Sequence, residues 1–284
     1  MTRIGPYELH AIETGTFALD GGAMFGIVPK PLWTRSITPD AKNRIPMHMR
    51  CLLLIGEGRV ILIDNGLGDK FDAKFASIYA VDQETTNLHA SLAAVGVGVD
   101  DVTDVILTHL HFDHCGGSTR RNGERLELVF PNATIHVQRD HWHWAEQSNV
   151  REQASFLADN LAPIGASGLL NLIDGAQELF PGLAVEPMNG HTKGQQVVHI
   201  YDAHQRLVYV ADLLPTHAHL RPAWNMAYDL WPMKTIAEKA AFLERAVDGN
   251  WSLFFEHDAA VEVADVTRTE RGVITTAHRR LADG

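Results

Sequence analysis

Short apolar runs separated by polar turns dominate the first half of the chain. Residues 50–55 and 59–63 are two such runs on either side of Gly56-Glu57-Gly58, which predicts a β-hairpin. Weaker alternation at residues 7–13 and a brief apolar run at residues 104–107 predict two further strands. The pattern also predicts short helices at residues 70–78 and 87–95.

The second half has the same character. Strands are predicted at residues 134–138, 183–187, 196–201, 207–210 and 251–255, and helices at residues 140–147, 151–160 and 233–247. Strands and helices do not alternate strictly, which favours two sheets covered by helices over a doubly wound parallel sheet. The Gly- and Pro-rich segment 15–46 has little periodicity and is expected to be a long loop, which would be either a lid or pocket wall or an ordered surface excursion.

Composition and charge narrow the classes of partner. The chain has 284 residues, enough for one large domain, and a formal net charge of −11. Such an acidic chain is a poor match for nucleic acid or for anionic lipid. Two cysteines do not make a disulfide framework, and the N-terminus lacks the apolar segment of a signal peptide. We therefore expect a soluble, cytoplasmic protein that binds neither nucleic acid nor membrane.

Histidine is unusually frequent, with 16 residues, and four metal-ligand side chains crowd one short segment. His109, His111, Asp113 and His114 directly follow the apolar strand at residues 104–107. Imidazole nitrogens and carboxylates are the ligands that a borderline cation such as zinc accepts. The spacing H-x-H-x-D-H therefore predicts a metal site just beyond the end of this strand.

Three later segments offer ligands for a second metal. His191, Asp212 and the sequence Glu256-His257-Asp258 each come just past the end of a predicted strand. If four strand ends meet at one edge of the fold, their side chains converge. A dinuclear centre needs such additional ligands and a bridging group.

These marks, taken in order, resemble the metallo-β-lactamase superfamily along nearly the whole chain. They are Asp64-Asn65-Gly66, the segment 109–114, Gly190-His191-Thr192, Asp212 and His257. The resemblance implies an α+β fold in which two mixed β-sheets are flanked by helices in a four-layer αβ/βα sandwich. It implies a single domain over residues 1–284.

The resemblance also implies roles for individual residues. His109, His111 and His191 would hold one metal, Asp113, His114 and His257 a second, and Asp212 would bridge the two. Asp64 would orient a ligand histidine, because a ligating imidazole favours a carboxylate on its other nitrogen. The implied cofactors are two divalent ions, with Zn²⁺ expected first and Mn²⁺, Co²⁺ or Fe²⁺ as alternatives.

A bridging water between two such cations loses a proton near neutral pH and becomes the nucleophile. Asp113, beside this hydroxide, would orient it or carry a proton to the leaving group. The resemblance therefore implies a metal-dependent hydrolase.

The turn at residues 109–117 is most similar to that of N-acyl homoserine lactone lactonases and methyl parathion hydrolase-like enzymes. The expected substrate is a small apolar lactone or carboxylic ester, with phosphotriesters as possible side substrates. Pro215 stands where the lactonases carry a tyrosine three residues after the bridging aspartate. Nearby polar and aromatic residues are candidates to replace it, and among them His219 is the expected catalytic residue.

Three other functions stay open at this point. They are an organophosphate triester hydrolase, a mono-iron redox enzyme similar to persulfide dioxygenases, and a non-catalytic binding module on a degenerate scaffold. A homodimer also stays open, because no interface is evident in the sequence.

Overall fold

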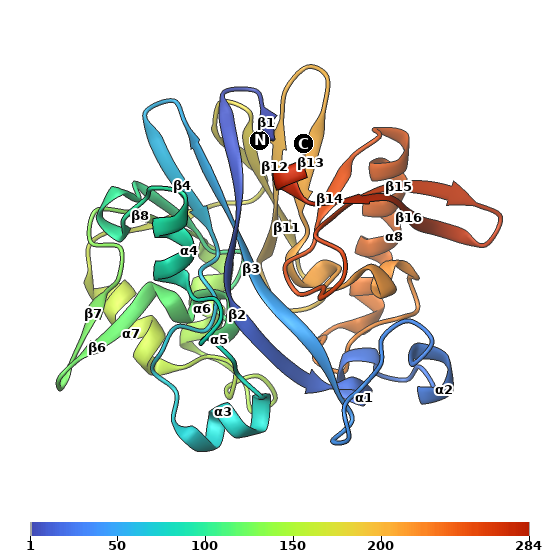
Figure 1. Cartoon of the computed structure of the whole chain (residues 1–284), viewed down its shortest axis with the longest axis horizontal. Helices are drawn as coiled ribbons and strands as arrows, with labels where there is room; N and C mark the ends of the chain where they lie inside the picture. Colours follow the sequence, from blue (N-terminus) through green and yellow to red (C-terminus); the bar gives the residue numbers. More distant parts are fainter. Residues whose placement is uncertain (1, 284) are drawn as a thin grey trace. The chain divides into compact units, whose positions relative to one another are not determined.

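The computed structural model describes residues 2–283, which divide into two compact units. Unit 1 comprises the residues up to Thr16 together with Met49–Gly175, and unit 2 comprises Phe17–His48 together with the residues from Ala176 onward. Strands β2 (Tyr7–Asp20) and β3 (Arg44–Gly56) contribute residues to both units (Figure 1).

The sheet of unit 1 has seven strands in the order β1-β2-β3-β4-β5-β8-β9. The remaining strands are β1 (Arg3–Ile4), β4 (Arg59–Ile63), β5 (Asp104–Ile106), β8 (Thr134–Gln138) and β9 (Leu170–Ile173). β3 and β4 are antiparallel, whereas β4, β5, β8 and β9 run parallel to one another. A separate hairpin is formed by β6 (Thr119–Asn122) and β7 (Arg125–Leu128).

Helices cover the parallel part of this sheet. They are α4 (Leu88–Ala94), α5 (Phe112–Cys115), α6 (Arg139–Glu146) and α7 (Ala158–Ala166), whereas α3 (Ala73–Tyr79) has no buried residue. Leu92 of α4 and Trp142 of α6 belong to the same buried cluster as Leu62, Val105 and Ile135 of the strands. Parallel strands are usually buried on both faces of the sheet, which explains why these strands are short apolar runs in the sequence. The buried strands support the loops that follow them.

The sheet of unit 2 has seven strands in sequence order. They are β10 (Gln177–Phe180), β11 (Leu183–Met188), β12 (Gln195–Tyr201), β13 (Arg206–Tyr209), β14 (Ser252–Phe254), β15 (Val263–Thr269) and β16 (Gly272–Arg279). Only β13 and β14 pair in parallel, because the long helix α8 (Pro232–Asp248) connects them. Phe242 and Leu243 of α8 pack in one buried cluster with Val208 and Leu253.

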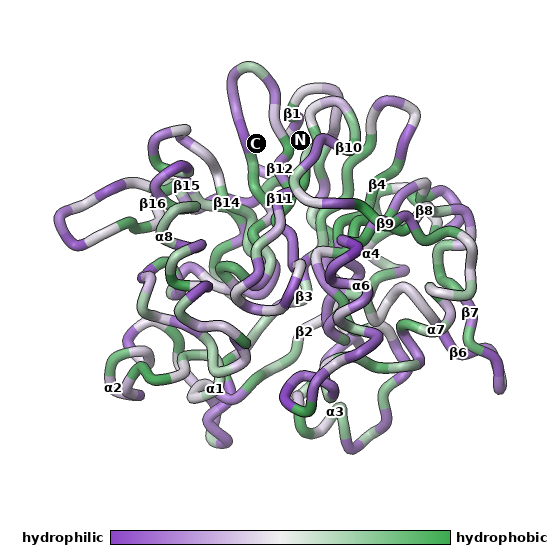
Figure 2. Tube along the Cα trace, turned by 180° about the vertical axis from the view of Figure 1, so that it is seen from behind, coloured by the Kyte–Doolittle hydropathy of each residue, from purple (hydrophilic) through white to green (hydrophobic). Residues whose placement is uncertain are grey.

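In Figure 2 the hydrophobic residues lie along the inner strands, whereas the tips of the β6–β7 and β15–β16 hairpins are hydrophilic. Both sheets are mixed and both units carry helices, so the predicted α+β class is confirmed. The expectation of a single domain over residues 1–284 stays a prediction. No helix within residues 2–283 combines the length and apolar character needed to cross a membrane.

Two sequence predictions were wrong in detail. The helix predicted at residues 151–160 is a series of turns, and α7 begins only at Ala158. The Asn149 side chain accepts a hydrogen bond from the Arg151 amide at 2.9 Å, a local bond that competes with helix formation. Segment 15–46 is not one loop, because β2 continues to Asp20, helices α1 (Gly21–Phe25) and α2 (Lys30–Trp33) follow, and β3 begins at Arg44.

Candidate metal centre

The histidine segment of unit 1 follows β5, continues into α5 and is buried. His109 and His114 are 0% exposed, and His111 and Asp113 are each 7% exposed. His109 Nε2 lies 3.0 Å from His111 Nδ1, and the rings of His109 and His114 are 3.9 Å apart between centroids. The short turn after β5 therefore brings three imidazoles together, as the sequence predicts.

Asp64 fixes the orientation of this group. Its Oδ2 accepts a hydrogen bond from the Thr108 hydroxyl at 2.6 Å and lies 3.1 Å from His114 Nδ1. Because the Thr108 proton is committed to Asp64, the Thr108 oxygen accepts from His109 Nδ1 at 3.1 Å. This arrangement leaves Nε2 of His109 and Nε2 of His114 as the nitrogens with lone pairs.

Glu152 orients the ring of His111, as Asp64 orients the ring of His114. Glu152 is 4% exposed, and its Oε1 lies 2.9 Å from His111 Nε2. Its other oxygen accepts a hydrogen bond from Trp144 Nε1 at 2.7 Å. Sequence reasoning missed this residue, because a glutamate in a polar segment carries no signal of burial.

Unit 2 contains its own set of candidate ligands, arranged around Asp212. Asp212 Oδ2 lies 3.2 Å from His191 Nε2, and Asp212 Oδ1 lies 3.3 Å from His257 Nε2. The remaining nitrogens are held from behind, His191 Nδ1 by Asp229 Oδ1 at 3.0 Å and His257 Nδ1 by the His48 carbonyl at 2.8 Å. One carboxylate therefore presents its two oxygens to two different histidines.

These side chains fit divalent metal ions. Each of the five histidines has one ring nitrogen held by an oxygen and turns the other toward another potential ligand. Nε2 of His109 and Nδ1 of His111 face each other with lone pairs at 3.0 Å, which is repulsive unless a proton or a cation lies between them. Ligating histidines in metal sites are held by a partner on the other nitrogen in this way.

Glycines allow the loop of Asp64 to lie against the histidine segment. A Cβ on Gly116 would lie 2.0 Å from the Leu67 carbonyl oxygen, and a Cβ on Gly117 would lie 2.2 Å from that of Asn65. The Asn65 amide donates to the His114 carbonyl at 2.9 Å across this contact. The two backbones approach so closely that only glycine fits at residues 116 and 117.

His219, the expected catalytic residue, is 1% exposed in unit 2. Its Nδ1 lies 2.8 Å from the Thr216 hydroxyl, and its Nε2 donates to the Met24 carbonyl at 2.9 Å. The ring stacks on Phe25, with 4.7 Å between centroids. Burial, together with the charge of Lys239, lowers the pKa of His219 to about 4, so the ring is neutral at physiological pH.

Cys115 is no candidate nucleophile. Burial raises the pKa of its thiol to about 12, and the thiol donates to the Leu110 carbonyl at 3.3 Å. A thiol in this environment stays protonated and inert.

Comparison with known proteins agrees with this geometry. The family model for the metallo-beta-lactamase superfamily matches residues 50–257. An N-acyl homoserine lactonase of Bacillus cereus is 29% identical over 170 residues, which is 57% of this chain and 60% of the length of that relative. This chain therefore matches less than two thirds of that relative.

Two solved structures resemble this one over almost the whole chain. A probable metal-dependent hydrolase from Staphylococcus aureus is 30% identical, with a TM-score of 0.90 and 98% of each chain covered. AidC, a dizinc quorum-quenching lactonase in complex with a product, has a TM-score of 0.81, with 98% of this chain and 97% of AidC covered. AidC is only 23% identical, so that likeness concerns the fold. By the extent of the family match and the likeness to the Staphylococcus aureus structure, the chain belongs to the metallo-β-lactamase superfamily.

Proposed function

We propose that this protein is a metal-dependent hydrolase that acts on lactones or carboxylic esters. One observation carries the proposal. In each of five histidines, an oxygen atom holds one ring nitrogen, and the other ring nitrogen faces another potential metal ligand. Superfamily membership and a lactonase relative support the reaction class.

The proposed centre holds two divalent ions. The ligands of the first are His109, His111 and His191, those of the second are Asp113, His114 and His257, and Asp212 bridges the two. The two oxygens of Asp212, each directed at a different histidine, support the bridging role. Zinc is the expected metal, and manganese, cobalt and iron(II) are alternatives. When bound, the ions supply Lewis acidity and lower the pKa of a coordinated water toward neutrality.

Asp113 is the proposed proton carrier for the leaving group. Its side chain is 11% exposed, and its Oδ2 lies 3.9 Å from His114 Nε2. A carboxylate that is nearly buried but still reachable can take up a proton from the attacking water and pass it on. For His219 we propose a positioning role, because both of its ring nitrogens are engaged by Thr216 and Met24.

Aromatic side chains beside Asp113 favour an apolar substrate. The ring of Phe112 lies 5.2 Å from that of Phe75 and 5.5 Å from that of Tyr79, between centroids. Burial, and secondarily the charge of Asp113, raises the pKa of Tyr79, so its phenol stays protonated at neutral pH. An apolar wall with a few polar groups suits a lactone, an ester or a phosphotriester better than a highly charged substrate.

The decisive experiment is a substrate panel on zinc-, manganese- and cobalt-loaded protein. We expect turnover of lactones and aryl esters, with weaker turnover of phosphotriesters. Asp212→Ala should lose metal and turnover together. Protein that retains two metals but hydrolyses no lactone or ester would overturn the proposal. Preferred turnover of phosphotriesters would favour the organophosphate hydrolase, and one bound iron with oxygen uptake on a thiol substrate would favour the redox enzyme.

A further inference from the structure

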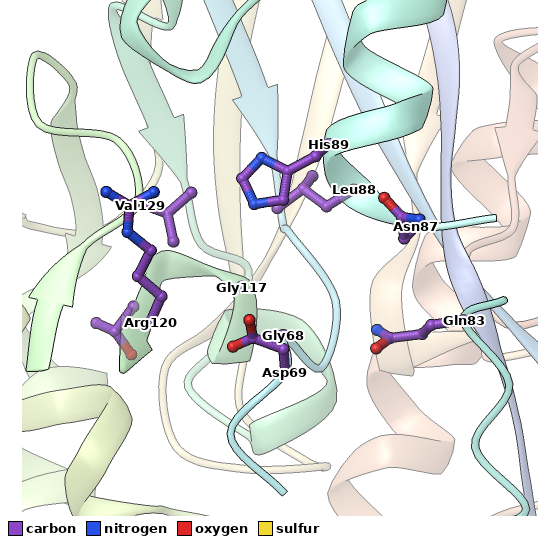
Figure 3. Close-up of a pocket in the computed structure, with 10 residues that line it drawn as sticks. Gly68, Asp69, Gln83, Asn87, Leu88, His89, Gly117, Arg120 and Val129 are labelled. Carbon is purple, nitrogen blue, oxygen red and sulfur yellow. The ribbon is translucent and has the colours of Figure 1, made fainter. Parts of the chain in front are cut away.

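A pocket lies in unit 1 at residues other than the proposed metal ligands. It has a volume of about 270 Å³, and none of the seven proposed ligands lines it. Leu88 and Val129 supply apolar wall, and the charged or titratable side chains at the pocket are Asp69, His89 and Arg120. Figure 3 shows Asp69 of the β4–α3 loop, His89 of α4 and Arg120 of β6 around the pocket, with the guanidinium of Arg120 beside Val129.

The walls of this pocket are fixed by hydrogen bonds. The Lys70 ammonium donates to the carbonyl oxygens of Gly116 and Thr119, both at 2.6 Å, and so ties the β4–α3 loop to the start of β6. Asn87 caps α4 by accepting from the Ala90 amide at 3.0 Å. The pocket is therefore held open by the fold, and binding would not require its walls to be ordered first.

The protein itself uses the charges at the pocket only in part, because Arg120 forms an ion pair with Glu127 and Asp69 acts electrostatically on the neighbouring Lys70. Arg120 donates through Nε to Glu127 at 2.8 Å, and its two terminal amino groups have no hydrogen-bond partner within residues 2–283. Asp69 forms no hydrogen bond or salt bridge within the same residues. Opposite charges thus stand at one cavity without pairing with each other.

We propose that this pocket binds an aliphatic α-amino acid. The guanidinium of Arg120 offers paired donors that suit a carboxylate, and Asp69 offers an acceptor for an ammonium group. Leu88 and Val129 give an aliphatic side chain apolar surface to cover. A ligand with a single charge would leave either Asp69 or Arg120 unused, so the pair selects a zwitterion. The cavity volume is near the lower limit of ligand pockets, as a molecule of this size requires.

The test uses the full-length, metal-loaded protein and three probes of similar size. L-leucine carries both charges, 4-methylpentanoate only the carboxylate, and 3-methylbutylamine only the ammonium group. Isothermal titration calorimetry should show L-leucine binding about tenfold more tightly than either analogue, the worth of one charged hydrogen bond. In amide NMR spectra, L-leucine should shift resonances of residues 87–89 and 117–120.

Two variants separate the contributions of the charges. Asp69→Asn should weaken L-leucine binding about tenfold and leave the affinity for 4-methylpentanoate unchanged. Arg120→Gln should weaken L-leucine equally and leave the affinity for 3-methylbutylamine unchanged. Arg125→Gln on the same hairpin is the matched control, because Arg125 does not line the pocket, and its affinity for L-leucine should equal that of the wild type.

Absence of L-leucine binding up to about 10 mM would overturn the proposal. So would equal affinity for all three probes, or L-leucine affinity unchanged in both pocket variants. None of these readouts depends on hydrolysis, so the result is independent of the proposed function. Circular dichroism and melting temperature verify that each variant is folded.

Discussion

Glu152 Oε1 lies 2.9 Å from Nε2 of His111, and both side chains are nearly buried. This contact explains why a glutamate in an irregular segment is buried: it orients the ring of His111. It turns His111 Nδ1 toward His109 and raises the basicity of that nitrogen as a metal ligand.

Glu152→Gln should therefore weaken metal binding. An amide can still accept a hydrogen bond from His111 but carries no charge, and loss of such a partner costs about 10- to 100-fold in metal affinity. Chelator competition followed by elemental analysis measures the change. Glu146→Gln, at the exposed end of α6, is the control and should retain wild-type affinity. Equal metal affinity in the wild type and Glu152→Gln would show that the contact does not support the ligand.

His109→Ala should lower metal content and hydrolytic activity far more than His143→Ala. His109 is fully buried among the candidate ligands, whereas His143 lies exposed on α6. Metal content per chain and turnover of the best substrate of the panel provide the comparison. Similar losses in the two variants would mean that the cluster has been misassigned.

Gly116→Ala should destabilise unit 1 and loosen the metal site. The new methyl group would meet the Leu67 carbonyl at 2.0 Å, which forces the backbone apart at a cost of about 3 kcal/mol. Gly123→Ala is the comparison, because its Cβ meets nothing within 4 Å and only its φ of 61° resists substitution, at about 1 kcal/mol. Urea unfolding of the metal-loaded variants measures both. A Gly116→Ala protein as stable as Gly123→Ala would contradict the close backbone contact.

His219 should make the protein sensitive to mild acid. Its folded-state pKa of about 4 lies below the ordinary value of 6.5, so the unfolded chain binds the extra proton first as the pH falls. The stability that neutral His219 contributes is present above about pH 6.5 and declines toward pH 4. Between pH 7 and pH 5 the loss amounts to about 2 kcal/mol.

His219→Phe removes this titration while an aromatic ring remains to stack on Phe25. The variant should be less stable than the wild type at pH 7, because the Met24 carbonyl loses its donor. Its stability should fall less steeply with pH, so the gap between the two proteins narrows by about 2 kcal/mol at pH 5. Denaturant unfolding at both pH values gives the two differences. A gap that stays constant with pH would show that His219 is not held neutral by burial.

The sequence by itself determined the chemistry of the site and the class of the fold. The spacing of His109, His111, Asp113 and His114 after an apolar strand predicts metal ligands, because the chemical nature of donors and their spacing are local properties. The hairpin at residues 50–63 could also be predicted from the sequence, since its apolar runs and its glycine turn are adjacent in the chain.

Only the tertiary structure decided how those ligands are held. Glu152 and His111 are 41 residues apart in the sequence, and Asp229 and His191 are 38 apart. No local sequence pattern could therefore predict either contact. The turns at residues 150–157 replaced a predicted helix, because the local bond at Asn149 competes with helix formation and Glu152 is buried against His111. Burial also gave His219 two hydrogen bonds and a lowered pKa, although in the sequence it was one polar residue among several near Pro215. The chemical identity of each candidate ligand can be read from the local sequence. The orientation, burial and pKa of its side chain depend on contacts between segments far apart in the chain.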